Sequence, residues 1–227
     1  MKRNIQIVLL GLCSLTCVAN AWGQKKNFTQ EVAVGGSFGM TFSSVSFSPS
    51  VSKGMKQGYT GGVIARWITE KNLGLQAELN YVQQGWKEKF EEQPQFEYSR
   101  TINYIELPFM THIYFGSDRV RFFFNLGPKI GYALNESTHS NLGPDDAPNR
   151  HNEQHDIPVQ KRFDWGLCGG PGLEVRTGIG SFLLEGRYYY ALGDIFNSRR
   201  ENPFSRSASQ VISAKLTYLF TVKKFTF

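Results

Sequence analysis

The sequence contains only one cysteine, Cys168, after its first two dozen residues, so an exported form of the chain would have no internal disulfide. Beyond those residues it also lacks any run approaching the ~20 apolar residues that a membrane-spanning helix needs. Its mean hydropathy is −0.33, and the apolar spacing typical of helices is nearly absent. If this chain crosses a membrane, it must therefore cross with strands.

The N-terminal residues, MKRNIQIVLLGLCSLTCVANAWGQ, have the layout of a secretory signal peptide. Lys2 and Arg3 form the positive region, an apolar core follows, and small residues near position 20 offer two cleavage sites. We predict a signal peptide over 1–23 and a mature domain over 24–227; an N-terminal anchor is the alternative, but the apolar run is short for it. Cleavage would lower the net charge from +6 to +4, too weak and too evenly spread for nucleic-acid binding.

Eight strand-like segments, many with strict alternation of apolar and polar residues, follow one another along the mature chain. They span residues 31–45, 59–69, 73–90, 100–115, 120–134, 162–177, 181–192 and 210–221. Long or medium connections (46–58, 91–99, 135–161, 193–209) alternate with tight ones (70–72, 116–119, 178–180). In an up-and-down barrel this alternation puts every long loop at one rim. We predict an all-β fold, an eight-stranded antiparallel up-and-down transmembrane β-barrel with long outer loops and short periplasmic turns.

One face of most segments is apolar, and the other face mixes polar and charged residues. In INYIELPFMTHIYF (102–115), for example, Ile105, Leu107 and Phe109 alternate with Glu106 and Pro108. A soluble lipocalin-type barrel has an apolar interior, whereas an outer-membrane barrel is apolar toward lipid and polar within. Aromatic residues also fall on the apolar face of most segments, as they do in interfacial girdles; these are Tyr59, Trp67, Tyr132, Trp165, Tyr188, Tyr190 and Tyr218. The pattern favours lipid against the apolar face.

The mixed faces bear five basic and five acidic residues. A basic residue turned toward lipid near the midplane would cost roughly 2–4 kcal/mol, whereas inside a closed barrel the two signs can neutralise one another. An eight-stranded barrel has an interior just wide enough for side chains to fill. We therefore predict an interior charge network that leaves no open water channel, formed by Arg66, Glu78, Glu106, Lys129, Asp164, Glu174, Arg176, Glu185, Arg187 and Lys215.

The segments GGSFGMTFS, LQAELNYVQQG, YIELPFMTHIYF, FFFNLGPKIGY, FDWGLCGGPGLEV and FLLEGRYYYALGDIF resemble the PorT-like outer-membrane β-barrel (porin-family) proteins of Bacteroidetes. The resemblance covers nearly the whole mature chain, and its most specific parts are E-L-x-Y, Y-I-E-L-P and aromatic-x-x-G-P-x-x-G-Y. It implies a small eight-stranded barrel of the cell outer membrane. Most members have no assigned biochemical activity, and the name-giving member belongs to the type IX secretion and gliding apparatus.

Two places depart from a regular strand. Pro108 removes a donor from a closed barrel, so we predict a local bulge or a water there, with the strand continuing through it. Outer-membrane barrels commonly end on an aromatic residue, yet Phe225 and Phe227 have the opposite parity from Phe220. Either the last strand contains a bulge or the tail lies outside it.

Catalytic and metal chemistry have little support in the sequence. An outer-leaflet lipid hydrolase needs a Ser–His pair facing lipid, but His112, the only histidine on a predicted strand, has inward parity. Three histidines and three aspartates lie in the polar segment 137–160, which reads as a solvated loop because it is rich in Pro and Asn; they are His139, His151, His155, Asp145, Asp146 and Asp156. We predict no enzyme activity, no cofactor and no metal.

The loops are the expected working surface, because binding tends to reside on loops that a rigid scaffold holds. We predict a monomeric structural or loop-mediated binding protein of the cell envelope, with an accessory role in type IX-like secretion or gliding as the alternative and a lipid-modifying enzyme less favoured. Expected partners are outer-membrane lipid and lipopolysaccharide, the barrel assembly machinery during biogenesis, and secretion-system proteins. Candidate outer-loop contacts are Lys53, Lys56, Arg199, Arg200 and Arg206.

Overall fold

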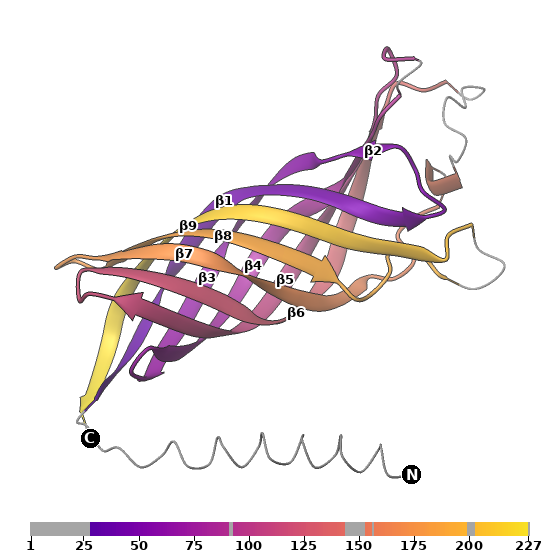
Figure 1. Ribbon diagram of the computed structural model, residues 1–227. Helices are drawn as coiled ribbons and strands as arrows, with labels where there is room; N and C mark the ends of the chain where they lie inside the picture. The colour runs from indigo at the N-terminus through magenta and orange to yellow at the C-terminus, as the bar shows by residue number, and fades with distance from the viewer. Residues whose placement is uncertain (1–27, 91–92, 144–152, 156, 199–202, 227) are drawn as a thin grey trace, which may run out of the picture.

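Eight long antiparallel strands close into a tilted barrel in the computed structural model (Figure 1). The structure describes residues 28–226 apart from 91–92, 144–152, 156 and 199–202; the predicted signal peptide lies outside the described residues. The barrel strands are β1 (Thr29–Ser48), β3 (Lys56–Glu70), β4 (Leu73–Glu88), β5 (Tyr98–Gly116), β6 (Val120–Ser140), β7 (Phe163–Arg176), β8 (Ser181–Ala191) and β9 (Arg206–Thr226). A two-residue strand, β2 (Lys53–Gly54), pairs with the end of β4, and a short 3₁₀ helix, η2 (Glu153–His155), lies in the longest loop.

Each barrel strand pairs with its sequence neighbours, and β1 pairs with β9 to close the ring. The predicted all-β, up-and-down fold is therefore confirmed. Tight turns join β3 to β4, β5 to β6 and β7 to β8, while the long connections gather at the opposite end (Figure 1). In the first of these turns Asn72 adopts a left-handed backbone with φ of 70°, and its side chain donates to the Tyr114 carbonyl at 2.6 Å. We call the tight-turn end periplasmic and the other end outer.

The strands at the outer end are longer than the alternation alone predicted. β6 continues to Ser140, where Tyr98 of β5 pairs with it, so the predicted loop 135–161 shrinks to 141–162. β9 likewise begins at Arg206, opposite Ser48, four residues before the predicted start. Beyond the membrane the outward positions of a strand do not face lipid and need not be apolar. The extensions therefore lack the apolar alternation from which strands were predicted.

The strand continues through Pro108 as predicted, and of the two predicted features there, a bulge or a water, the bulge is wrong. The pairing of β4 with β5 keeps one register from Leu73↔Ile113 to Lys87↔Ser99, and only the pairs opposite Leu107 and Pro108 are missing. Because Pro108 has no N–H, the ladder loses its hydrogen bonds locally without inserting an extra residue. The residue pairs before and after this position, with β4 on one side and β6 on the other, keep β5 in register through Pro108.

Two true bulges occur elsewhere. On β6, Asn135 pairs with Asn103 and Ala133 with Tyr104, which leaves Leu134 as the extra residue. On β9, Val222 is the extra residue opposite Val32 and Ala33 of β1. This second bulge resolves the parity problem of the last strand, because it returns Phe225 to the register of the outward-facing positions, opposite Gln30. Phe227 lies outside the described residues.

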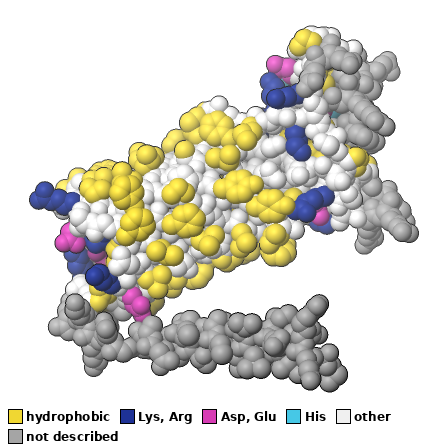
Figure 2. Space-filling view, in the orientation of Figure 1, with side chains coloured by type: hydrophobic (Ala, Val, Ile, Leu, Met, Phe, Trp, Pro, Cys, Tyr) yellow, Lys and Arg dark blue, Asp and Glu magenta, His cyan; other side chains and the backbone are white. Residues whose placement is uncertain are grey.

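Figure 2 shows an apolar band across the visible face of the barrel, with charged side chains gathered at its two ends. Every barrel strand has exposed large apolar side chains. On β5 the outward residues Ile105, Leu107, Phe109, Ile113 and Phe115 are each between 38% and 56% exposed, as predicted. The exposed outward aromatic residues include Tyr59, Trp67, Tyr132, Trp165, Tyr188 and Tyr218. Among the described residues, no helix is long and apolar enough to cross a membrane.

Candidate functional site

All ten residues of the predicted charge network project from the barrel wall to its inside. Their positions alternate with the lipid-facing residues, so strand geometry alone turns them inward. Nine are buried, and Arg176, at the periplasmic mouth, is 20% exposed. All of them except Asp164 form ion pairs, and these pairs fall into three groups along the barrel axis, called here the inner, middle and outer layers.

The inner layer lies nearest the periplasmic end. Arg66 of β3 donates two hydrogen bonds to Glu174 of β7, at 2.8 and 3.1 Å, in the bidentate geometry that suits a guanidinium and a carboxylate. Arg176 pairs with Glu31 of β1 at 2.5 Å and lies 3.9 Å from Glu174. Two cations meet two anions, so this layer is neutral. Glu31 is a member that the sequence analysis did not select.

The middle layer is centred on Glu78 of β4. Its carboxylate accepts from Arg187 of β8 at 2.7 and 2.9 Å and from Lys215 of β9 at 2.7 Å. Arg187 also donates to Glu185 at 2.9 Å, so two cations again meet two anions. Three neighbouring amides, from Gln76, Asn80 and Asn125, donate to the two carboxylates. Buried charges with this many hydrogen bonds offset much of their desolvation cost.

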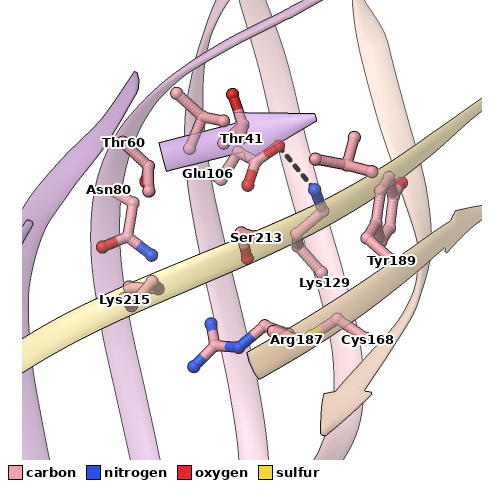
Figure 3. A pocket seen from close by; sticks show the side chains of 12 residues that line it. Thr41, Thr60, Asn80, Glu106, Lys129, Cys168, Arg187, Tyr189, Ser213 and Lys215 are labelled. Carbon is pink, nitrogen blue, oxygen red and sulfur yellow. Dashed lines mark hydrogen bonds and ion pairs between the residues drawn. The ribbon is translucent and has the colours of Figure 1, made fainter. Parts of the chain in front are cut away.

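The outer layer pairs Lys129 of β6 with Glu106 of β5 at 2.5 Å (Figure 3). The Lys129 ammonium also lies 3.2 Å from the centre of the Tyr189 ring, a cation–π contact. Asp164 departs from the predicted pairing: its carboxylate accepts from the Tyr189 hydroxyl at 2.8 Å and makes no ion pair with any described residue. Tyr189 therefore stands between Asp164 and the cation that the sequence analysis assigned to the same network.

Side chains fill the space between these layers almost completely. The cavity at the middle and outer layers has a volume of about 30 Å³, and Glu106, Lys129, Arg187 and Lys215 line it (Figure 3). That volume holds about one or two water molecules. The periplasmic mouth is wider, with a recess of about 550 Å³ bordered by Glu31, Arg121 and Arg176 among others. The barrel interior is thus open only as a recess at the periplasmic end of the described structure, and side chains close it beyond that recess.

An apolar cap closes the outer end. Trp86, Phe47, Phe196 and Phe204 contact one another through their rings, at centroid distances between 5.0 and 6.3 Å. They form one buried cluster with Val45, Val51, Phe90, Tyr98, Ile102, Tyr104, Ala133 and Ile195, against which Ile157 and Val159 pack. Loops that look polar in sequence therefore carry apolar side chains into the barrel mouth.

The segment around η2 is fastened to this cap, which corrects the expectation of a solvated loop. The His155 ring stacks on Tyr98 with centroids 3.9 Å apart, and its Nε2 lies 3.0 Å from the buried Glu88 carboxylate. Gln154 donates to the same carboxylate at 2.7 Å. Arg100 donates to the carbonyls of residues 155 and 157, at 3.1 and 2.5 Å. His139 is exposed on β6, and His151, Asp145, Asp146 and Asp156 lie outside the described residues.

The three described members of the candidate outer-loop cations, Lys53, Lys56 and Arg206, make separate contacts. Lys53 lies over the Phe47 ring, and Lys56 points to Ser99 at 3.4 Å; burial lowers the pKa of both ammonium groups, and for Lys56 the nearby Lys87 adds to the effect. Arg206 is exposed, hydrogen bonds to the Tyr190 hydroxyl and packs over its ring. Arg199 and Arg200 lie outside the described residues. Each of the three described cations thus contacts a different side chain, and the structure shows no common site for these three.

His112 lies in the interior and has no access to lipid. Its ring is fully buried, with Nδ1 2.8 Å from the Asn125 amide oxygen and Nε2 3.5 Å from Arg66. Within the described ranges, no group of three or more His, Cys, Asp or Glu side chains could hold a metal ion. Most of the residues that were not identified from the sequence are uncharged side chains that hydrogen bond to the layers. The others are the charged rim residues Glu88, Arg100 and Glu136. For Glu31, its inward parity with Ala33 was an available signal.

Comparison with known proteins supplies independent findings. A family model described as "Outer membrane protein beta-barrel domain" matches residues 22–197. No curated protein sequence matches the chain. Among solved structures, the outer membrane protein OprG of Pseudomonas aeruginosa is similar over 86% of this chain and 97% of its own, with 12% identity and a TM-score of 0.51. Neisserial surface protein A aligns over 85% and 99% (14% identity, TM-score 0.45), and Ail of Yersinia pestis over 84% and 99% (13%, 0.41).

Proposed function

The chain belongs to the outer membrane protein beta-barrel domain family, and from this premise we propose that it is a closed, non-conducting outer-membrane barrel whose capped outer end is a binding surface of the cell envelope. One observation carries the proposal: charge-balanced layers fill the interior and leave a cavity of only about 30 Å³. A water-filled pore needs a continuous lumen, and eight strands enclose little more than their own inward side chains.

Conductance measurement tests this function directly. Purified full-length protein, shown to be folded by its heat-modifiable migration, is added to a planar bilayer, with a sixteen-stranded porin as the positive control for insertion. We expect no stable conductance steps, because ions would have to displace paired charges at three successive layers. Reproducible steps of constant size at low voltage would show that the interior is open and that the proposal is wrong.

The proposed role is not enzymatic. The motif that a lipid hydrolase requires is a histidine beside a nucleophile at the lipid face, and His112 is instead bonded to Asn125 inside the barrel. This buried position of the imidazole supports a role other than lipid hydrolysis. Loss of the chain should leave the acylation pattern of lipopolysaccharide unchanged, as mass spectrometry of purified lipid would report; an altered pattern restored by wild-type protein but not by His112→Ala would favour the enzyme.

An accessory role in a type IX-like secretion or gliding apparatus is the second candidate, and it rests on the resemblance to PorT-like proteins of Bacteroidetes in Y-I-E-L-P and the related segments. A closed barrel suits an accessory part better than a conduit. Deletion of the gene should then reduce secretion of cargo and gliding, both restored by the wild-type chain. Normal secretion and gliding in the deletion strain would remove this candidate without affecting the first one.

The expected partners follow from the same architecture. The apolar band requires outer-membrane lipid around it, and insertion of such a barrel requires the barrel assembly machinery (Figure 2). Closure of the ring by β1 and β9 leaves no edge strand in the lipid-facing part of the described barrel, which supports a monomer. Export through a cleaved signal peptide at 1–23 completes the proposed route to the outer membrane.

A further inference from the structure

At the outer end of the barrel, β7 and β8 end nearer the membrane than the neighbouring strands β6 and β9 do. β7 begins at Phe163 and β8 ends at Ala191, while β6 and β9 continue outward and pair there only with β5 and β1. Two loop segments fill the resulting notch through backbone hydrogen bonds: Ala133 donates to Arg162, Lys161 to Ile195, and Ile195 to Ser207. The backbone that carries Lys161 and Arg162 is thus fixed to the rim on both sides.

A groove of about 490 Å³ opens on the outer surface of this notch. Its lower part is apolar and continues the lipid-facing band, with Phe163 56%, Trp165 49% and Leu192 46% exposed. Its upper part is formed by Lys161 and Arg162 together with Gly193 and Asp194. Two hydrogen bonds from the N–H groups of residues 192 and 193 to the Trp165 carbonyl hold the groove in shape.

The two cations of this groove are available for an external anion. Neither side chain forms an ion pair with a carboxylate in the described part of the chain, whereas Lys87, elsewhere on the rim, is paired with Glu97 at 3.7 Å. The acid in the groove, Asp194, already accepts a hydrogen bond from the Ser207 N–H at 2.7 Å. A third outward cation, Arg206, lies over Tyr190 on the neighbouring strands.

We propose that this groove binds the phosphorylated headgroup of lipopolysaccharide. The chemistry of the groove matches that ligand. Two cations whose backbone is held to the rim can meet the phosphates, and the exposed aromatic and aliphatic side chains that line the same groove can meet the acyl chains. A soluble phosphate would use only the upper half of the groove. The inference rests on the proposed outer-membrane location and adds a defined lipid site to it.

Binding of labelled, O-antigen-free lipopolysaccharide to detergent-solubilised, folded protein tests the site. The double variant Lys161→Glu/Arg162→Glu should weaken binding by about tenfold or more, because each cation near a lipid phosphate contributes about fivefold. The milder Lys161→Gln/Arg162→Gln should weaken it less and guards against misfolding of the first variant. The control Lys71→Glu/Arg119→Glu makes the same charge change at exposed positions of the periplasmic turns and should bind like wild type.

Ligand comparisons identify what the groove recognises. Dephosphorylated lipopolysaccharide should bind the wild type about tenfold more weakly, and inorganic phosphate or phosphatidylglycerol should compete poorly. Equal binding of the dephosphorylated lipid, equal competition by phosphatidylglycerol, or unchanged affinity in both groove variants would overturn the proposal. Conductance of the same preparations is read separately, so loss of the lipid site and failure of the closed-barrel function give different results.

Discussion

Glu78 is the residue on which the interior depends most. Its carboxylate accepts hydrogen bonds from two cations and two amides, contributed by β4 itself, β8 and β9. Strands distant in sequence are thus joined through one buried anion. A buried carboxylate of this kind contributes less by its net attraction than by keeping Lys215 paired and the charge of Arg187 fully balanced in the barrel interior.

Glu78→Gln should therefore destabilise the barrel strongly. It leaves Lys215 without its ion pair and Arg187 with only one, and removal of one partner of a buried pair costs roughly 3–5 kcal/mol. The urea midpoint of protein refolded in lipid vesicles measures this cost. Glu97→Gln makes the same chemical change in an exposed pair with Lys87, where about 1 kcal/mol or less is expected. Equal midpoints for the two variants would contradict the role assigned to Glu78.

Gly170 and Gly186 provide a second residue-scale comparison. A Cβ on Gly170 would lie 1.9 Å from the carbonyl oxygen of Gly186, whereas a Cβ on Gly186 would meet nothing within 4 Å. Gly170→Ala should thus push β7 from β8 and cost at least about 1–3 kcal/mol, as overpacking does. Gly186→Ala should leave stability unchanged. The measurement is the temperature at which each variant loses its heat-modifiable migration, which should be lower for Gly170→Ala. Similar temperatures for the two variants would show that β7 and β8 separate at little cost.

The connection between β6 and β7 shows how an element can be misread from composition. Its Pro, Asn and His content is typical of solvated loops, yet Ile157 and Val159 pack on the cap and His155 stacks on Tyr98. The apolar residues were visible in the sequence, but their partners come from the far ends of β1, β4 and β5. Strand parity describes neighbours along one strand; it does not place a loop across the barrel mouth.

Glu88→Ala should release this segment while the barrel stays folded. The substitution removes the acceptor shared by Gln154 and His155, although Arg100 still holds two carbonyls of the segment. We expect faster amide hydrogen exchange across 153–160 and unchanged protection in the barrel strands, since local opening needs no global unfolding. Glu97→Ala serves as the exposed control. Unchanged exchange in the segment would show that the apolar contacts alone hold it.

Across the whole molecule, the features that depend on period-2 alternation could be predicted from the sequence. The features that depend on packing between distant residues could not. Strand number, the order of tight and long connections and the inward direction of ten charges all follow from alternation. The choice of ion-pair partners does not follow from alternation, because a pair can join strands that are not neighbours in the barrel, as Arg66 and Glu174 do. The same limit explains Asp164, whose partner became the Tyr189 hydroxyl, and the bulge at Val222, which only the β1 register reveals.

The apolar band makes a depth-dependent prediction for the entire barrel. Leu126 is 53% exposed on the outward face of β6, between the aromatic residues Phe122 and Tyr132, whereas Ile179 is 75% exposed in a periplasmic turn. In a lipid bilayer, Leu126→Arg should cost about 2–4 kcal/mol and Ile179→Arg about 0–1 kcal/mol. Guanidinium unfolding of protein inserted in vesicles measures both values.

A soluble barrel would respond differently, because surface substitutions in water usually change stability by less than about 0.5 kcal/mol. Leu126→Arg and Ile179→Arg would then be indistinguishable, and the band around the strands would have no lipid to face. A cost at Leu126 that exceeds the cost at Ile179 would show that Leu126 lies deeper in the bilayer than the periplasmic turn. The long loops and the groove at Lys161 and Arg162 would then lie beyond one interface, where a lipid headgroup can reach them.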